Sequence, residues 1–443
     1  MELRRLDNIV AIKTAPGEAQ ESQVIGFHAH NLQVAEISVD AWQALGASAA
    51  SVSASEEHQE LEFWNHEIDP AVVDAEIAQT PRHYLVNIAQ ICNLKCDYCA
   101  AGGDGTFGEA MKNIDLETIY EQIAMILHDI PSGDDFTLTF FGGEPLLAFQ
   151  NIRHLVRYVK LQTAGRNIDV FYRLITNGTL LTPEIAEYLA SIHCHVTISI
   201  DGPPEINDLA RKTKTGKGST ALALRGLETL QPVRERLGSL AVSAVFGKHH
   251  TNVVKAYEFL REFGFDYLKF DFAAEAGDNE ASREYAEQLC RTADLAYALG
   301  GEKELRRIGF FDGTFRTLDQ QRRLYNYCGA GKSLLTADGK GRVAACQWFL
   351  GKPSEQLGQG TKIDHDRLAG YAGRLTELNN CQQCWARHLC GGGCMYVNQV
   401  KSGSKHKKDQ EFCNRTRTTL AKAIEYYAKA RKSVTEGDRS ETY

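Results

Sequence analysis

Short hydrophobic runs alternate with helical periodicity along the middle of the chain. Apolar residues recur at spacings of three and four in two of the intervening segments, from Leu116 to Leu127 and from Ile152 to Val159. Strands that alternate with amphipathic helices form parallel βα units, so the pattern predicts an α/β fold, either an open sheet or a partial barrel. In both, the chemistry lies at the carboxyl ends of the strands. The six predicted strands are residues 84–89, 136–141, 170–176, 195–200, 240–246 and 267–272.

Two of the predicted helices have recognisable first turns. Asp115 is a candidate cap for the helix that begins at Leu116, and Thr182-Pro183 places a hydroxyl cap before a proline in the first turn. These signals predict where the helices begin.

The flanking segments have a different pattern. Residues 1–70 contain short strand candidates (9–13, 23–27 and 32–37), a helix start at Ser38, and a polar, acidic stretch that predicts a linker (51–69). We expect a small α+β appendage here.

The main domain is expected at residues 78–275 and a helical bridge at residues 276–326. Residues 327–443 are rich in glycine and cysteine with little periodicity, and they close with an amphipathic helix near residues 420–432. A segment of this kind needs metal or covalent staples, which makes its cysteines candidates for structural ligands.

Composition excludes several classes of protein. The net charge of −8 gives no global reason to bind nucleic acid, and the basic run from Lys401 to Lys408 is local. No stretch approaches the ~18 consecutive apolar residues of a membrane helix, and the N-terminus lacks the apolar core of a signal peptide. We therefore expect a cytoplasmic protein with no membrane partner. Because thiols stay reduced there, the twelve cysteines indicate metal or redox chemistry.

Cys92, Cys96 and Cys99 form a CxxxCxxC motif directly after the first strand of the main domain. Three thiolates can hold three irons of a [4Fe–4S] cube and leave the fourth iron without a protein ligand. The spacing alone is also compatible with a zinc knuckle or with buried structural cysteines.

Polar and glycine-rich turns follow the next strands. Gly142-Gly143-Glu144-Pro145 ends the second strand, where glycine permits close backbone approach and a carboxylate can pair with an ammonium group. Asn177-Gly178 and Asp201-Gly202 follow the third and fourth strands. Each pair is also ordinary turn chemistry when taken singly.

Seven further cysteines are spaced through the C-terminal segment, with Cx12Gx4C followed by Cx2Cx5Cx3C and a final cysteine. A zinc ribbon uses similar spacings and is the alternative interpretation. The seven residues are Cys328, Cys346, Cys381, Cys384, Cys390, Cys394 and Cys413.

With the aromatic Tyr98 before its third cysteine, the chain from residue 84 to residue 272 resembles the radical S-adenosylmethionine (SAM) superfamily. The resemblance implies a partial (β/α)6 TIM-like barrel and a [4Fe–4S] cluster whose open iron binds SAM, cleaving it to a 5′-deoxyadenosyl radical. It also implies roles in SAM binding for eight residues. Gly142, Gly143 and Glu144 would contact the methionine amino group, Asn177, Ser199 and Asp201 the ribose, Arg211 the carboxylate and Val245 the adenine pocket.

The C-terminal cysteines resemble the SPASM module of radical enzymes that act on peptides and proteins. That resemblance implies two auxiliary iron–sulfur clusters, expected to be [4Fe–4S]. Cys381, Cys384, Cys390 and Cys413 would hold the second, and Cys328, Cys346 and Cys394 the first, whose fourth ligand is unassigned. Cys290 is a weak candidate for that ligand, although Cys290 and Cys194 are better explained as small buried hydrophobes.

This branch includes several chemistries, and the leading hypothesis is a maturase that cross-links a ribosomally made precursor peptide through a carbon–carbon or thioether bond. Sulfatase maturases, which make formylglycine, usually carry an aspartate after the cysteine equivalent to Cys346, where this chain has Gln347. The N-terminal segment resembles leader-peptide domains but is equally explained as a cap. Asp271 is a candidate base or a structural polar residue.

The implied partners are a precursor peptide and an electron donor such as flavodoxin or ferredoxin. The alternative from a different class is a non-catalytic zinc or iron–sulfur binding protein. It would not cleave SAM.

Overall fold

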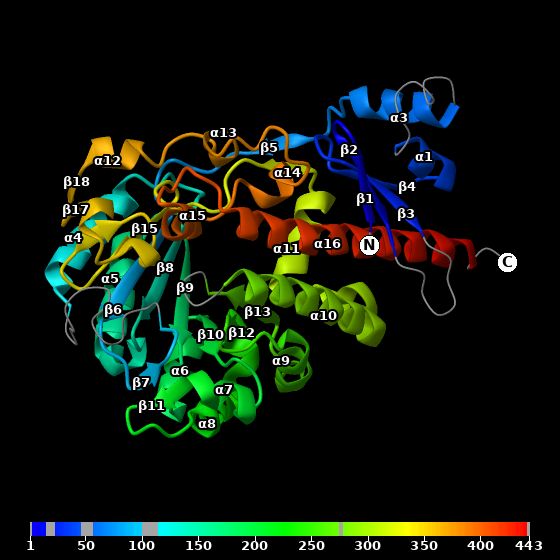
Figure 1. Ribbon diagram of the computed structural model, residues 1–443. Coiled ribbons are helices and arrows are strands. Elements are labelled where there is room, and N and C mark those ends of the chain that lie inside the picture. The colour runs from blue at the N-terminus through cyan, green and yellow to red at the C-terminus, as the bar shows by residue number, and fades with distance from the viewer. Residues whose placement is uncertain (1, 15–22, 46–55, 100–113, 274–277, 441–443) are drawn as a thin grey trace. The chain divides into compact units, whose positions relative to one another are not determined.

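The computed structural model describes residues 2–14, 23–45, 56–99, 114–273 and 278–440, with side chains up to Lys432 in the last range (Figure 1). The chain divides into two compact units, each assembled from separate stretches of sequence. The first unit comprises Met1–Glu76, Ser282–Tyr327 and Arg374–Tyr443. The second comprises Ile77–Ala281 and Cys328–Gly373.

The second unit is built on a ten-stranded sheet in the order β13-β12-β10-β9-β8-β6-β15-β16-β17-β18. Neighbouring strands from β13 to β15 pair in parallel, and the pairs from β15 to β18 are antiparallel. The six strands that carry the βα units are β6 His83–Ala89, β8 Asp135–Gly142, β9 Asp169–Thr176, β10 His195–Ser199, β12 Ser239–Phe246 and β13 Tyr267–Phe272.

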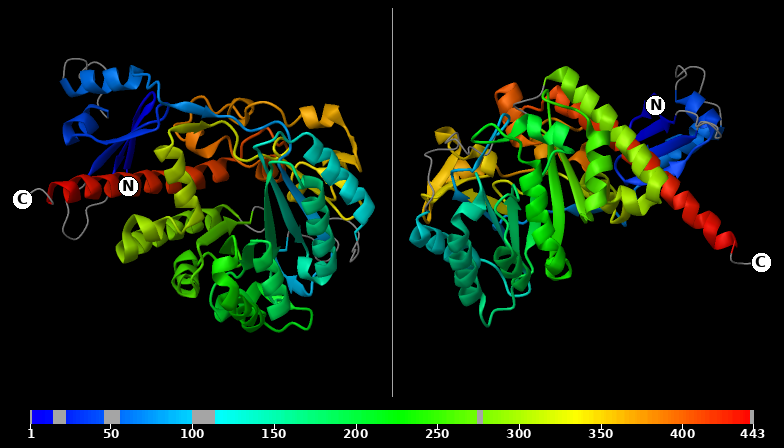
Figure 2. Two further views of the ribbon diagram at one scale, coloured as in Figure 1. Left: turned by 180° about the vertical axis from the view of Figure 1, so that it is seen from behind. Right: turned by 90° about the horizontal axis from the view of Figure 1, so that it is seen from below.

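Alternating burial explains why these segments are strands. In β12 every second residue from Leu240 to Phe246 is buried, which leaves the intervening positions on the other face of the sheet. The helices between the strands lie along the outer side of the sheet (Figure 2). They are α4 Leu116–His128, α5 Phe149–Thr163, α6 Pro183–Ser191, α7 Pro204–Ala210, α8 Thr220–Leu230 and α9 Val253–Leu260.

The predicted α/β fold with parallel βα units is confirmed. Both predicted caps are confirmed as well, since Asp115 accepts a hydrogen bond from the Thr118 amide and Thr182 accepts one from the Ile185 amide. These caps satisfy amide groups that a helix leaves unpaired in its first turn.

The sheet extends further than the sequence predicted. Four short strands continue it beyond β6, and the first of them, β15, pairs in parallel with β6. Hydrophobic periodicity cannot detect strands of two to four residues separated by glycine turns such as Gly341, whose φ is 70°. The four are β15 Leu334–Ala337, β16 Arg342–Ala344, β17 Gln356–Gln359 and β18 Lys362–Ile363. Three short segments, β7 Leu94–Cys96, β11 Arg211–Thr213 and α12 His365–Ala369, complete this unit.

The first unit combines an N-terminal antiparallel sheet with helices from later in the chain. Sheet residues such as Phe27 pack in one hydrophobic core with Trp385 and with Ile424 of α16 (Gln410–Ser440). The sheet strands are β1 Glu2–Leu6, β2 Ile9–Lys13, β3 Val24–His28 and β4 Gln33–Glu36, in that order. The other elements are α1 Val39–Ala44, α3 Glu56–His66, β5 Val73–Ala75, α10 Asn279–Leu305, α11 Gly309–Asp319, β14 Arg322–Leu324, α13 Leu375–Leu378, α14 Arg387–Cys390 and α15 Met395–Ser402.

Part of the predicted linker is wrong, because α3 occupies residues 56–66. Few residues of α3 are buried, but Leu61 packs against Ile9 and Ala41, and the Trp64 indole donates to the Gln33 amide oxygen at 2.9 Å. A polar helix held by a few tertiary contacts looks like a linker in sequence. Within the described ranges, no helix is both long and apolar enough to cross a membrane.

Gly226 of α8 lies against the turn that follows β9. A Cβ atom at Gly226 would come within 1.9 Å of the Gly178 carbonyl oxygen. We expect Gly226→Ala to lower the free energy of unfolding by about 1–3 kcal/mol, as for other overpacked sites. The control is Gly313→Ala in α11, where no atom lies within 4 Å of the added carbon and helix propensity favours alanine. Urea unfolding should separate the two, and equal midpoints would contradict the predicted clash.

Candidate functional site

The three-cysteine motif lies just beyond the carboxyl end of β6, in the second unit. Cys96 is in β7, which pairs antiparallel with β11 and places Arg211 opposite Cys96. The Leu94 amide donates to the Cys92 sulfur at 3.4 Å, and the Cys99 amide donates to the Cys96 carbonyl at 3.2 Å. The loop that carries the three thiols is therefore held by its own backbone and by β11.

The three thiols lie within electrostatic range of one another and form no disulfide. Burial raises the pKa of Cys92 to about 11, and burial raises the pKa of Cys96 to about 12 although the Arg211 guanidinium opposes that shift. Thiolates rather than thiols bind metals, so loading this site releases protons. Three converging thiols, with no fourth cysteine near them in sequence, fit a cluster with one open iron.

The glycine pair after β8 packs directly against the segment that leads into Cys92. A Cβ atom at Gly142 would lie 2.4 Å from the Ala89 carbonyl oxygen, and one at Gly143 would lie 2.3 Å from the Ile91 carbonyl oxygen. The Gly143 amide donates to Ala89 at 2.7 Å. Side chains at these two positions would push the turn away from the cysteine loop.

Glu144 is completely buried at this turn. Its carboxylate accepts hydrogen bonds from the Leu146 amide at 3.0 Å, the Thr176 hydroxyl at 2.7 Å and the Asn177 amide at 2.8 Å. Burial raises the pKa of Glu144, while these donors oppose the shift. The carboxylate therefore joins the carboxyl ends of β8 and β9.

Asn177 extends this connection to the cysteine loop. Its side-chain amide donates to the Asn93 oxygen at 2.9 Å and to the Cys92 sulfur at 3.7 Å. Glu144, Asn177 and Cys92 are thus brought together, although they are far apart in sequence.

Asp201 and Arg211 form a buried ion pair after β10, with 3.0 Å between Arg211 Nε and Asp201 Oδ2. Asp201 also accepts hydrogen bonds from the Val245 amide at 2.9 Å and the Tyr98 hydroxyl at 2.5 Å. The carboxylate therefore links β10, β11 and β12 to the residue before Cys99. Ser199 ends β10 and is half-buried.

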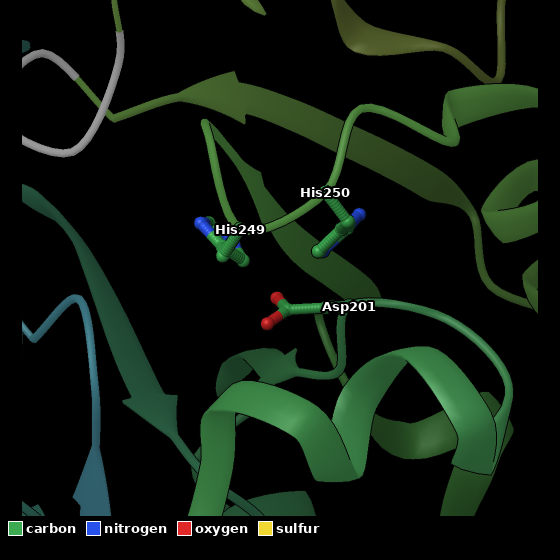
Figure 3. A group of neighbouring side chains, drawn as sticks. All are labelled: Asp201, His249 and His250. Carbon is green, nitrogen blue, oxygen red and sulfur yellow. The ribbon is translucent and has the colours of Figure 1, made fainter.

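His249 and His250 face the same carboxylate from the loop after β12, with Asp201 directed toward that loop (Figure 3). The potential ligand atoms of the three residues lie within 4.8 Å of one another. Asp201 is nevertheless occupied by Arg211, Tyr98 and Val245, which argues against a divalent cation. Instead, the His249 ring stacks on Tyr98 with centroids 4.6 Å apart.

Burial lowers the pKa of both histidines, to about 4 for His250. Sequence reasoning missed this pair. Its position just after a strand of the main domain was the available signal.

Four of the C-terminal cysteines come together in the first unit. The thiols of Cys381, Cys384 and Cys413 all raise the pKa of Cys390, although burial is the larger cause and takes it to about 12. Backbone turns hold them locally, since the Cys384 amide donates to the Cys381 carbonyl at 2.8 Å and the Cys413 amide donates to the Asp409 carbonyl at 3.1 Å.

The remaining predicted ligands are divided between the units. Cys328 and Cys346 belong to the second unit, and Cys394, the N-cap residue of α15, belongs to the first. Cys290 is half-buried, with its sulfur 4.0 Å from the Thr418 carbonyl oxygen. Asp271 pairs with Lys269 at 3.0 Å in β13.

Residues 86–235 match the model of the radical SAM superfamily. The chain carries a radical SAM domain. The likeness to known proteins extends beyond that domain and includes several enzymes with related chemistry.

The chain is 33% identical over 190 residues to an uncharacterized protein of Methanocaldococcus jannaschii, over 43% of this chain and 62% of that protein. It is 26% identical to a cysteine-type anaerobic sulfatase-maturating enzyme of Clostridium perfringens, over 71% of this chain and 88% of the enzyme. It is 23% identical to the radical SAM cyclopropyl synthase TigE of Paramaledivibacter caminithermalis, over 76% and 73%. The relatives thus include a protein-modifying enzyme and a cyclopropyl synthase.

Solved structures share the fold of this radical SAM protein. The structure of anSMEcpe with bound AdoMet and the Kp18Cys peptide superimposes with a TM-score of 0.67 at 21% identity, over 80% of this chain and 99% of that chain. Streptococcus suis SuiB bound to the precursor peptide SuiA superimposes with a TM-score of 0.53 at 16% identity, over 93% of this chain and all of that chain. The radical SAM fold predicted from the sequence is therefore confirmed.

Proposed function

We propose that this chain is a cytoplasmic radical SAM maturase that installs an intramolecular carbon–carbon or thioether cross-link in a ribosomally synthesised precursor peptide. The observation that carries the proposal is the presence of two kinds of cysteine site in one chain. Three converging thiols suit a cluster with an open iron, and four converging thiols suit a closed cluster that only transfers electrons.

The open cluster, when bound with SAM, supplies a 5′-deoxyadenosyl radical. The residues around it have separate roles in the proposal. Glu144, held by Thr176 and Asn177, receives the methionine ammonium beside Gly142 and Gly143. Ser199 and Asn177 hold the ribose.

The other predicted SAM contacts lie around the buried ion pair. Arg211 pairs with the methionine carboxylate, and Val245 lines the adenine pocket. Asp201 holds Arg211 and the Tyr98 hydroxyl in place from below. This gives Asp201 a positioning role in addition to its proximity to the ribose.

Cross-link formation removes two hydrogens from the peptide, and each has a destination. One leaves as a hydrogen atom to the deoxyadenosyl group, and the other leaves as a proton and an electron. The proposed acceptors of the electron are two auxiliary [4Fe–4S] clusters in a SPASM module. The second would use the four grouped cysteines, and the first Cys328, Cys346 and Cys394.

The second candidate function is formylglycine formation on a sulfatase. The coverage of the Clostridium perfringens enzyme, 88% of its length, favours it. Two observations favour the peptide maturase instead. Gln347 follows Cys346, where sulfatase maturases usually carry an aspartate base, and the fold likeness to SuiB extends over 93% of this chain.

The experiment is co-expression under low oxygen with small peptides encoded beside the gene, followed by mass spectrometry. We expect a precursor that loses two hydrogens with the wild-type enzyme and is unchanged with Cys92→Ala. An unchanged precursor, together with conversion of a cysteine to formylglycine in a sulfatase peptide, would reject cross-linking in favour of the second candidate.

A further inference from the structure

The basic segment from Lys401 to Lys408 contains four lysines and a histidine and no acidic residue, in a chain whose net charge is −8. It follows α15, and Lys401 and Lys407 are exposed. The proposed peptide chemistry does not use these charges.

The segment is held in a defined conformation by Asn398, which is 1% exposed. The Asn398 side chain donates to the Lys405 carbonyl at 3.2 Å and accepts from the Asp409 amide at 3.1 Å. Ser402 also donates to the Lys407 carbonyl at 2.6 Å. The lysines therefore project from a loop that is tied at both ends, which preserves their spacing as a surface.

This loop lies beside the four grouped cysteines in the first unit. Lys408 donates to the Asn380 carbonyl at 2.6 Å, directly before Cys381. Burial raises the pKa of both Cys381 and Cys413, and the Lys408 ammonium opposes the shift at each thiol. Nearby acidic groups are few, since Asp409 caps α16 through the Phe412 amide and Glu411 faces Arg283 at 3.7 Å.

We propose that the Lys401–Lys408 loop is the docking surface for an acidic one-electron carrier protein that exchanges electrons with a cluster at Cys381, Cys384, Cys390 and Cys413. The inference rests on the proposed function, because it requires that cluster. A positive surface on a negatively charged protein steers an acidic partner to one place, and electrostatic steering acts mainly on the association rate.

The electron balance of the exchange is simple. A reduced [2Fe–2S] ferredoxin loses one electron and becomes oxidised, and the four-cysteine cluster gains that electron. No bond or proton changes hands. In peptide cross-linking the same surface would let the leftover electron leave for an oxidised carrier.

The test uses the wild-type holoenzyme and a double charge reversal, Lys401→Glu with Lys407→Glu. Reduced plant-type [2Fe–2S] ferredoxin is mixed with each oxidised enzyme, and its reoxidation is followed by stopped-flow absorbance. The matched control is Arg291→Glu with Lys303→Glu, two exposed residues of α10 in the same unit, which changes the net charge equally. Reduction by dithionite is measured in parallel for all three proteins.

We expect the loop variant to slow the second-order rate about tenfold or more at low ionic strength, with the difference shrinking as salt is added. The control should stay within about twofold of wild type, and dithionite should reduce all three equally. Equal ferredoxin rates for the loop variant and wild type would overturn the docking proposal alone. A wild-type protein in which dithionite reduces no cluster at the four cysteines would overturn the auxiliary-cluster assignment and the docking proposal with it.

Discussion

Replacing Cys92 by alanine is expected to abolish the formation of 5′-deoxyadenosine from SAM, down to the level of an enzyme-free control. The Cys92 sulfur is one of three ligands that converge at this edge of the sheet, and two remaining thiols cannot hold a cube in one orientation. The readouts are deoxyadenosine by chromatography and iron per chain after anaerobic reconstitution. Iron should fall by one cluster and not to zero, because the C-terminal cysteines are untouched.

The control for this prediction is Cys194→Ala. Cys194 is fully buried at the start of β10, away from the cysteine groups, so its loss should cost stability but leave SAM cleavage intact. Retained deoxyadenosine formation in Cys92→Ala would contradict the assignment of the cluster.

Asp201→Asn is expected to lower the free energy of unfolding of the apoprotein by about 3–5 kcal/mol, as when one partner of a buried ion pair is removed. The Arg211 guanidinium is only 8% exposed and would keep its charge without the carboxylate that balances it. The Val245 amide and the Tyr98 hydroxyl would each lose an anionic acceptor as well. The shift in the urea midpoint measures the loss.

Two further variants separate the ion pair from its neighbours. Tyr98→Phe removes a single hydrogen bond to a charged group and should cost about 1.5–3 kcal/mol. Replacing both Asp201 and Arg211 by leucine removes both charges, so it should destabilise less than Asp201→Asn does. A loss below about 1 kcal/mol in Asp201→Asn would show that the pair is not buried as described.

The strands of the main domain were predictable because their hydrophobic runs are long enough to be read against the helical segments between them. β12 illustrates this, since its alternation extends over four buried positions. β1 was missed because Glu2, Arg4 and Arg5 give it an exposed, charged pattern. It is a strand because its backbone pairs with β2, which a single sequence does not reveal.

The candidate site shows a similar division. The motifs at Cys92, Gly142 and Glu144 combine residue types that serve few other purposes at strand ends, so their spacing was informative. The contacts of Asp201 were less accessible, because its partners Tyr98, Arg211 and Val245 come from three other segments. Only the folded chain brings them to one carboxylate. The roles of these residues in SAM binding stay predictions.

The central claim is that Cys92, Cys96 and Cys99 hold an iron–sulfur cluster with an iron open to SAM. The most direct test is the electron paramagnetic resonance spectrum of the dithionite-reduced protein before and after SAM is added. We predict a brown protein with a reduced-cluster signal that shifts on SAM addition, and no SAM-dependent shift in Cys92→Ala. A colourless zinc protein, or a cluster signal that SAM leaves unchanged in the wild type, would contradict the account.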